Sequence, residues 1–300
     1  MPSLVKKKVI VRVLGGIGNQ LFSYAAARRL ALHNEMELVI DDVSGFKYDH
    51  QFKRTNQLNN FSIPCRKATP SERMEPFSRL RRFLRKKHNR AKGFSKRDYI
   101  LQELFDFDNR LLDLNPVSDV YIEGYWQSEN YFIDIEDIIR KDLEIIPPND
   151  IINRKMADLI SKKNSVAIHF RYFDIADSGP DNLPLDYYNK AIKRIREEVI
   201  SPHFFIFSDK PELAAENLTF SEGEYTLVQH NQGDEMAYAD LWLMKQCRHF
   251  IIANSTFSWW GAWLSENKDK VIIAPKLDKK FGESWWGFDG LLPSTWILLD

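Results

Sequence analysis

The sequence predicts an α/β protein with two domains, each built on a mostly parallel sheet. Short apolar runs alternate with helix-patterned segments through the second half, and a glycine turn between a strand and a helix opens the first. A length of 300 residues fits about two domains. Because the adjacent prolines at positions 147 and 148 interrupt helix formation, we expect domains at 1–150 and 151–300, with the last residues able to pack back on the first domain.

Charge and cysteine content exclude several classes of protein. The 42 basic and 42 acidic side chains cancel, so no nucleic acid partner is expected. Cys65 and Cys247 lie far apart and form neither a disulfide framework nor a metal-ligand pair, which favours a reducing, cytoplasmic location. We also expect no secretion signal and no membrane span, because no long uncharged apolar run is present.

The first domain begins as a βαβ unit. A strand at Val9–Leu14, a helix at Gln20–His33 and a strand at Glu37–Ile40 are expected, with the glycine turn between the first two. The turn resembles a dinucleotide-binding fingerprint because Gly16 and Gly18 are followed about twenty residues later by an acid. Leu21 stands where that fingerprint has its third small residue, so a nicotinamide or flavin site is a weaker alternative.

A strongly basic segment follows an irregular, polar connection over residues 49–67. Between Arg79 and Arg97 there are ten lysines or arginines and no acid, with Leu80, Phe83 and Leu84 interleaved. Such a segment lies on an anionic membrane, binds an acidic polymer, or is a solvated surface helix. A short strand at Val120–Ile122 and a helix at Tyr131–Leu143 complete this half.

The second domain repeats a strand followed by a polar strand end and a helix. The expected strands are Ser165–His169, Phe204–Phe207, Tyr225–Val228, Phe250–Ala253 and Val271–Ala274, and the expected helices are Leu185–Val199, Pro211–Leu218, Met236–Cys247 and Phe257–Glu266. Strands separated by helices form a parallel sheet with right-handed crossovers. Ligands of such sheets bind outside the carboxyl ends of the strands.

Polar side chains follow several of these strand ends. They are Arg171, Ser208, Asp209, Ser255 and Thr256, and a helix begins beside the last two at Phe257. A guanidinium, hydroxyl groups and a helix N-terminus bind phosphate, while Asp209 or Asp240 suits a ribose hydroxyl or a base N–H. Each residue alone has a structural alternative as a cap or turn residue, and Trp259, Trp260 and Trp263 are expected to fix the last helix against the sheet. Together they predict a nucleotide site.

Four spaced motifs resemble one family. His169-Phe-Arg171-Tyr-Phe-Asp174 resembles the His-x-Arg-Arg-x-Asp motif of α1,2- and α1,6-fucosyltransferases. Phe205-Ile-Phe-Ser208-Asp209 and Asn254-Ser-Thr-Phe-Ser-Trp-Trp-Gly261 resemble the second and third motifs, and Leu14-Gly-Gly-Ile-Gly-Asn-Gln20 is similar to the amino-terminal signature of the α1,2 enzymes. Because it carries all four motifs, the chain resembles bacterial α1,2-fucosyltransferases of glycosyltransferase family 11.

The resemblance implies a GT-B fold, in which two Rossmann-like domains face each other across a cleft. It implies inverting transfer of L-fucose from GDP-β-L-fucose to the 2-hydroxyl of a β-galactoside, without a metal ion or other cofactor. The acceptor would be a galactose-terminated glycan, as in O-antigen or capsule biosynthesis. A cytoplasmic enzyme of this kind could contact the inner membrane face peripherally through Arg79–Arg97.

The resemblance also assigns site residues. The catalytic set is Arg171, Asp174 and His169; the donor-binding set is Arg171, Ser208, Asp209, Asp240, Asn254, Ser255, Thr256, Phe257 and Ser258; and the cleft or acceptor side is Gly16, Gly18, Asn19 and Gln20. His169 is either a base or a residue that orients Arg171, and Asp174 is either the base or a partner of Arg171. Tyr172 and Phe173 depart from the motif's second arginine and glycine, which leaves Arg171 as its single phosphate arginine.

Three other functions remain open on the sequence. A fucosyltransferase of another linkage, such as an α1,6 enzyme, shares the first motif. An NAD-dependent oxidoreductase would use Gly16, Gly18 and Asp41. A glycan-binding protein without activity would use the aromatic side chains.

Overall fold

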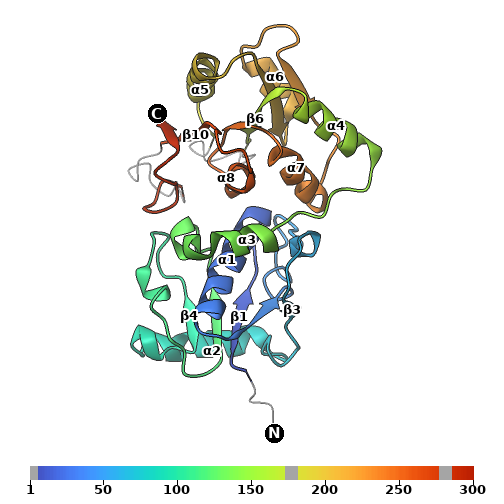
Figure 1. The fold of residues 1–300 in the computed structure, drawn as a ribbon. Coiled ribbons are helices and arrows are strands. Elements are labelled where there is room, and N and C mark those ends of the chain that lie inside the picture. The colour runs from blue at the N-terminus through green and yellow to red at the C-terminus, as the bar shows by residue number, and fades with distance from the viewer. Residues whose placement is uncertain (1–5, 173–181, 277–285) are drawn as a thin grey trace. The chain divides into compact units, whose positions relative to one another are not determined.

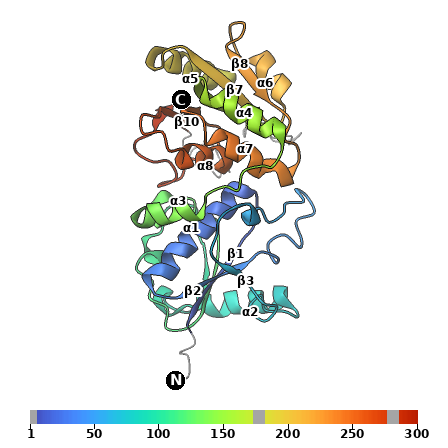
Figure 2. The same cartoon turned by 45° about the vertical axis from the view of Figure 1, so that its right-hand side comes forward.

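The protein is described here from a computed structural model, which describes residues 6–172, 182–276 and 286–300. The chain divides into two compact units (Figure 1). Unit 1 comprises Met1–Glu144 with Asp289–Leu291, and unit 2 comprises Ile145–Phe288 with Leu292–Asp300. Each unit contains one parallel sheet flanked by helices, seen from a second direction in Figure 2, so the α/β prediction is confirmed.

The sheet of unit 1 has the order β3-β2-β1-β5-β4, and its strand pairs are parallel. The strands are β1 (Lys8–Arg12), β2 (Glu37–Asp41), β3 (Arg66–Lys67), β4 (Tyr99–Leu101) and β5 (Val120–Glu123). The helices are α1 (Ile17–His33), α2 (Ser78–Arg90) and α3 (Glu136–Asp142), with short 3₁₀ turns at Leu58–Asn60, Phe94–Lys96, Asn109–Leu111, Glu129–Tyr131 and Ile133–Ile135. Helix α1 buries an apolar, alanine-rich surface against β1 and β2.

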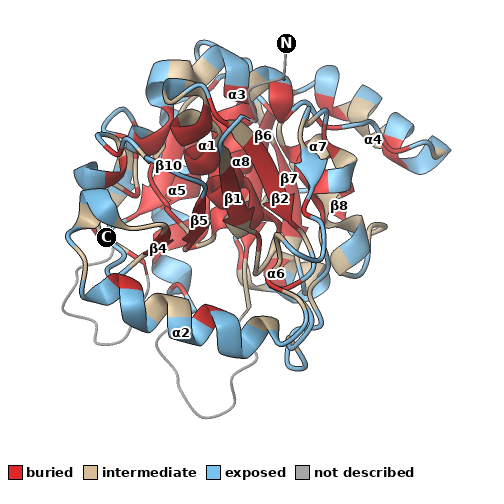
Figure 3. Cartoon of the chain, turned by 90° about the horizontal axis from the view of Figure 1, so that it is seen from below, coloured by how far each residue is buried: buried red, intermediate tan, exposed pale blue. Residues whose placement is uncertain are grey.

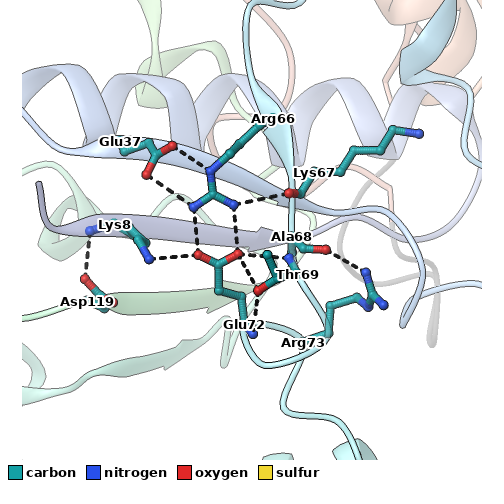
Figure 4. A network of polar contacts seen from close by, with 9 residues as sticks. All are labelled: Lys8, Glu37, Arg66, Lys67, Ala68, Thr69, Glu72, Arg73 and Asp119. Atoms are coloured by element: carbon teal, nitrogen blue, oxygen red, sulfur yellow. Dashed lines mark hydrogen bonds and ion pairs between the residues drawn. The ribbon is translucent and has the colours of Figure 1, made fainter. Parts of the chain in front are cut away.

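The edge of this sheet is held by ion pairs rather than by burial. Strand β3 has only two residues, and both are exposed. Arg66 binds Glu37 through Nε at 2.7 Å and Glu72 through Nη2 at 2.7 Å, and Lys8 reaches the same Glu72 oxygen at 2.9 Å (Figure 4). The hydrogen bond from Arg66 is the main cause that lowers the pKa of Glu72. This network fixes the position of β3, although solvent limits what such exposed pairs add to stability.

The sheet of unit 2 has the order β11-β10-β9-β6-β7-β8, again with parallel pairs. The strands are β6 (Asn164–Phe170), β7 (Pro202–Ser208), β8 (Tyr225–Val228), β9 (His249–Ile251), β10 (Ile272–Pro275) and β11 (Ile297–Leu299). The helices are α4 (Ile151–Ser161), α5 (Leu185–Glu198), α6 (Pro211–Asn217), α7 (Ala237–Met244) and α8 (Thr256–Leu264), with a 3₁₀ turn at Asp234–Met236. The five predicted strands of this half are therefore confirmed, and they lie side by side.

Successive side chains of β6 point to opposite faces of the sheet, so the two faces contact different helices. Ile168 and Phe170 pack with the buried tyrosines of α5, where the Phe170 and Tyr188 rings stack at 4.3 Å. His169 points the other way and contacts α8. The next residue of the same parity is Arg171, which follows the end of the strand. The pleat thus separates a purely apolar core face from a face that carries polar chemistry.

Helix α8 is anchored by its three tryptophans. Trp259, Trp260 and Trp263 are all buried, and the rings of Trp259 and Trp263 stack with centroids 6.1 Å apart. Their burial is what side chains that fix the helix require, whereas the predicted contact with the sheet stays a prediction. The N-terminus of α8 is consequently held in one position at the end of β9.

Gly261 lets α8 approach α7 closely, and a side chain there should be costly. A Cβ atom at Gly261 would lie 2.4 Å from Sδ and 2.8 Å from Cγ of Met244. We expect Gly261→Ala to lower the free energy of unfolding by about 1–3 kcal/mol through overpacking, measured by urea titration. Gly93→Ala is the matched control, since nothing lies within 4 Å of a Cβ atom there. Equal stability of the two variants would contradict this packing argument.

Some elements differ from the sequence prediction. The helix expected over Tyr131–Leu143 is divided, because Phe132 adopts φ −149° and ψ 5°, which no α-helix accommodates. Only α3, at its end, is α-helical. The helix expected at Met236–Cys247 is shorter, and α4 was not predicted at all.

Candidate functional site

The carboxyl ends of four neighbouring strands of unit 2 bring the predicted nucleotide site together. In the sheet order, β9, β6, β7 and β8 are adjacent, and all their pairs are parallel. Asn254 to Ser258 therefore follow β9, Arg171 follows β6, and Ser208 ends β7 with Asp209 directly after it. This edge is the part of a parallel sheet where ligands bind.

Arg171 is held by an ion pair across the ends of two strands. Its Nη1 lies 2.8 Å from Oδ2 of Asp209, and the other carboxylate oxygen of Asp209 accepts a hydrogen bond from the backbone N–H of Tyr172 at 3.0 Å. One carboxylate thus fixes both the guanidinium and the backbone beside it. Ser208 accepts from the backbone N–H of Lys210 at 3.0 Å, which shapes the turn that carries Asp209. In this arrangement Asp209 holds Arg171 and Ser208 shapes the turn, and their predicted contacts with the donor stay predictions.

His169 connects the first motif to the N-terminus of α8. Its Nδ1 lies 2.9 Å from the hydroxyl of Ser258, which donates to the backbone carbonyl of Ser255 at 3.2 Å. Burial, together with the positive charge of Arg171, lowers the pKa of His169 to about 3. Its buried contact with Ser258 favours the alternative role of His169, a residue that orients the site, while its role as the base stays a prediction.

The N-terminus of α8 is capped and only partly covered. Ser255 is the N-cap, and its hydroxyl accepts from the N–H of Phe257 at 3.3 Å. Ser255 and Phe257 keep part of their surface exposed, whereas Asn254, Thr256 and Ser258 are buried. Of the predicted donor-binding turn, Ser258 faces His169, so Ser255 and Phe257 offer the accessible surface beside the helix dipole.

Asp240 lies on α7 in a network of amides that sequence reasoning missed. Its Oδ1 accepts from Asn231 at 2.8 Å, and the side chain of Asn231 exchanges hydrogen bonds with Asn153 of α4, at 2.9 Å each way. Nε2 of His230 lies 3.0 Å from Oδ1 of Asn153. Burial raises the pKa of Asp240 to about 7, although the hydrogen bond from Asn231 opposes it. Residues 230 and 231 come shortly after the end of β8, and this position in the sequence could have identified them as part of the site.

The predicted acceptor-side residues belong to the first βα turn of unit 1. Gly15 has φ +76°, which favours glycine, and its neighbour Gly16 precedes α1. Gln20 is fully buried, and its amide donates to the carbonyls of Gly15 and Thr55 at 2.9 Å each. Its oxygen accepts from the N–H of Gln57 at 2.8 Å. Gln20 thus holds two loops together, and its side chain is not available to a ligand, which corrects its assignment to an acceptor surface.

Asn19 and Gly18 differ from each other in exposure. Gly18 is buried within α1, whereas Asn19 is half-buried and accepts from the side chain of Gln127 at 2.7 Å. Asn19 and Gly16 therefore keep surface at the turn, and their role toward an acceptor stays a prediction. Asp174 and Phe173 lie outside the described residues. Tyr172, in place of the motif's second arginine, packs on Phe170 with ring centroids 4.9 Å apart.

Comparison with known proteins gives relatives across nearly the whole chain. A family model described as glycosyl transferase family 11 matches residues 8–285. The O-antigen biosynthesis glycosyltransferase WbnK of Escherichia coli is 31% identical over 283 residues, which covers 87% of this chain and 92% of that protein. An α-1,2-colitosyltransferase of Escherichia coli is 28% identical over 279 residues, covering 89% and 91%.

Human galactoside α-(1,2)-fucosyltransferase 1 is similar over a shorter stretch, with 27% identity over 124 residues that cover 37% of this chain and 33% of that protein. Among solved structures, a mutant of Arabidopsis thaliana FUT1 in complex with GDP superposes with a TM-score of 0.52 at 14% identity, covering 89% of this chain and 70% of that one. This likeness concerns the fold, which is the GT-B class with two Rossmann-like units. With a family model matching residues 8–285, the chain belongs to glycosyl transferase family 11.

Proposed function

We propose that the protein transfers L-fucose from GDP-β-L-fucose to the 2-hydroxyl of a β-galactoside, with inversion at the sugar carbon. The observation that carries this proposal is the pair Arg171 and Asp209 at the carboxyl edge of the unit 2 sheet, beside the capped N-terminus of α8. Relatives named for α-1,2 transfer and for O-antigen biosynthesis support the linkage and a glycan acceptor.

The proposed reaction places developing charge on the β-phosphate. The acceptor hydroxyl attacks the anomeric carbon, the bond to GDP breaks, and the reaction passes through an oxocarbenium-like state. Arg171, fixed by Asp209, and the N–H groups at the start of α8 would stabilise the leaving diphosphate. Asp174 remains the proposed base on the family resemblance alone. The proton of the acceptor hydroxyl would go to it.

Asp240 is proposed to accept hydrogen bonds from the N–H groups of guanine. Its carboxylate is positioned by Asn231, which is itself fixed by Asn153. Gly16 and Asn19 of unit 1 are proposed to face the acceptor. We further propose that no metal ion is needed, because a guanidinium and a helix N-terminus supply the positive charge. Within the described residues, no three side chains of His, Cys, Asp or Glu gather as a metal site.

A cytoplasmic location and a peripheral membrane contact through Arg79–Arg97 belong to the same proposal. No helix in the described part of the chain has the length and apolar character to cross a bilayer. The basic segment contains helix α2, which carries exposed cations and exposed apolar side chains, and this composition is the ground for proposing the contact.

Incubation with GDP-fucose and a panel of galactosides, with the linkage determined by NMR, tests the proposal. We expect an α1,2-linked product. An α1,6 linkage would reassign the enzyme to the first alternative. Thermal stabilisation by NAD and not by GDP would favour an oxidoreductase, and the absence of both transfer and hydrolysis of GDP-fucose would leave a glycan-binding protein.

A further inference from the structure

Helix α2 turns its polar residues inward. Arg82 is only 5% exposed, and its Nη1 forms no hydrogen bond with any described residue. Asn89, seven residues later on the same side, is buried and accepts from the backbone N–H groups of Asp98 and Tyr99 at 2.9 and 3.3 Å. A surface helix ordinarily buries its apolar stripe, so this orientation is the reverse of what the folding of unit 1 alone favours.

The outward side of α2 carries the large apolar residues. Leu80, Phe83 and Leu84 are 57%, 62% and 55% exposed, and their spacing gathers them on one side of the helix. Phe77, at the N-cap, is 75% exposed and has φ 63°, a conformation that is strained for a bulky residue. Figure 3 shows the helix as a mostly pale blue, exposed ribbon. We call Phe77, Leu80, Phe83 and Leu84 the α2 ridge.

The cations of α2 are also divided between its two sides. Arg85 and Lys86, toward the sheet, form ion pairs with Asp98 and Glu123, each at 2.9 Å. The outer cations, by contrast, form no ion pair with a described residue; they are Arg79, Arg81, Lys87 and Arg90. At 100° per residue these four flank the α2 ridge on both sides or lie within it. Their charge is therefore available to an external anion.

The surface extends beyond the helix to a neighbouring loop. A hollow of about 750 Å³ lies beside the N-terminal half of α2, lined in part by Lys47, Tyr48, Phe77 and Leu80. Tyr48 is exposed, and the guanidinium of Arg79 lies 5.7 Å from its ring centroid. Aromatic rings beside cations are the side chains that favour the headgroup level of a bilayer.

We propose that the α2 ridge and its four outer cations bind the surface of an anionic phospholipid bilayer. The ridge enters the boundary between headgroups and acyl chains, while the cations contact lipid phosphates. Charge complementarity argues against a second copy of the chain as the occupant, because two such helices would bring eight uncompensated cations together. A nucleic acid has the right charge but offers nothing for four exposed apolar side chains to enter.

Sedimentation of the full chain with vesicles tests this proposal. Vesicles of phosphatidylcholine alone are compared with vesicles that contain about 30% phosphatidylglycerol, because an anionic surface attracts basic segments. We expect binding at least tenfold stronger to the anionic vesicles, weakened by salt. Leu80→Ser/Phe83→Ser/Leu84→Ser and Arg79→Glu/Lys87→Glu should each reduce that binding at least tenfold.

Matched variants remove exposed apolar groups or reverse exposed charges elsewhere. Val117→Ser/Ile200→Ser and Lys155→Glu/Lys193→Glu should bind anionic vesicles like the wild type, since all four residues are exposed. Retained binding in the α2 variants, equal binding to both vesicle types, or no binding at all would overturn the proposal. So would self-association of the wild type in ultracentrifugation that the triple serine variant abolishes, or binding of DNA stronger than binding of vesicles.

The inference rests on the proposed peripheral contact but not on the donor or the acceptor. Transfer to a soluble galactoside should be unchanged within twofold in the α2 variants, because none of these residues belongs to the site on unit 2. If vesicle binding fails while transfer proceeds, the membrane proposal alone falls. If vesicle binding behaves as expected while no fucosyl transfer occurs, only the proposed activity falls.

Discussion

Arg171→Ala should lower kcat/KM for fucosyl transfer by about 10²–10³-fold while the melting temperature stays within a few degrees of the wild type. The loss follows from removing one preorganised charge from the leaving diphosphate, which costs about 2.7–4 kcal/mol in comparable sites. The fold should persist because Arg171 follows the end of β6 and is partly exposed. Steady-state kinetics with GDP-fucose measures the effect.

Arg196→Ala is the matched control for this prediction. Arg196 also forms an ion pair, with Glu224 at 2.7 Å, but it lies on α5, which packs on the apolar core face of the same sheet. Its variant should transfer fucose at the wild-type rate. Asp209→Asn, which keeps the shape but removes the charge that holds Arg171, should give an intermediate loss. Near-normal turnover of a folded Arg171→Ala protein would remove Arg171 from the mechanism.

Asp240 should make donor binding depend on pH. Its pKa is about 7, so lowering the pH from 8 to 6 converts most of the carboxylate to a neutral acid that no longer accepts two N–H groups from guanine. We expect KM for GDP-fucose to rise about tenfold over that range, in proportion to the loss of the carboxylate. Burial lowers the pKa of the neighbouring His230, which shifts its own titration toward the acid end of this range or below it.

Asp240→Asn should abolish that pH dependence and leave KM high throughout. The same variant should be more stable than the wild type at pH 8. A carboxyl group whose folded pKa is raised is favoured in its neutral form, so the wild type loses stability as pH rises from about 4 through about 7. Glu235→Gln, an exposed acid in the preceding turn, is the control and should change neither property. A KM that still varies with pH in Asp240→Asn would assign the effect elsewhere.

The regular parts of the fold were predictable because local patterns and long-range packing agree there. Strands β6, β7 and β9 and helix α8 are examples, since most of their residues are apolar and buried. Helix α4 was missed because two prolines come shortly before it and mask its start, which the Asp150 cap marks. Strand β3 was missed because two exposed residues contain no periodicity, and its position depends on Arg66 binding acids 29 residues before it and six after it.

The site was predictable in its residue types but not in its pairings. The rule for carboxyl strand ends brings Arg171 and Asp209 to one edge, yet it does not say that Asp209 would bind Arg171 rather than a ribose. Likewise, the alternation of β6 shows that His169 and Arg171 share a side, while the contact with Ser258, 89 residues away, arises from the packing of α8. Such partners follow from tertiary structure, which no local pattern contains.

Unit 1 includes a short segment from near the carboxyl terminus, which affects how the chain can be divided into fragments. Asp289 belongs to unit 1, where its N–H donates to Asp106 at 2.9 Å and its carbonyl accepts from Phe107 at 3.1 Å. A fragment ending at Glu144 would therefore lack part of unit 1. In that fragment, Asp106 and Phe107 would form hydrogen bonds with water instead of with Asp289. Proteolytic cleavage just after Glu144 should accordingly give two fragments that purify together under native conditions, because Asp289–Leu291 of the second fragment still packs in unit 1.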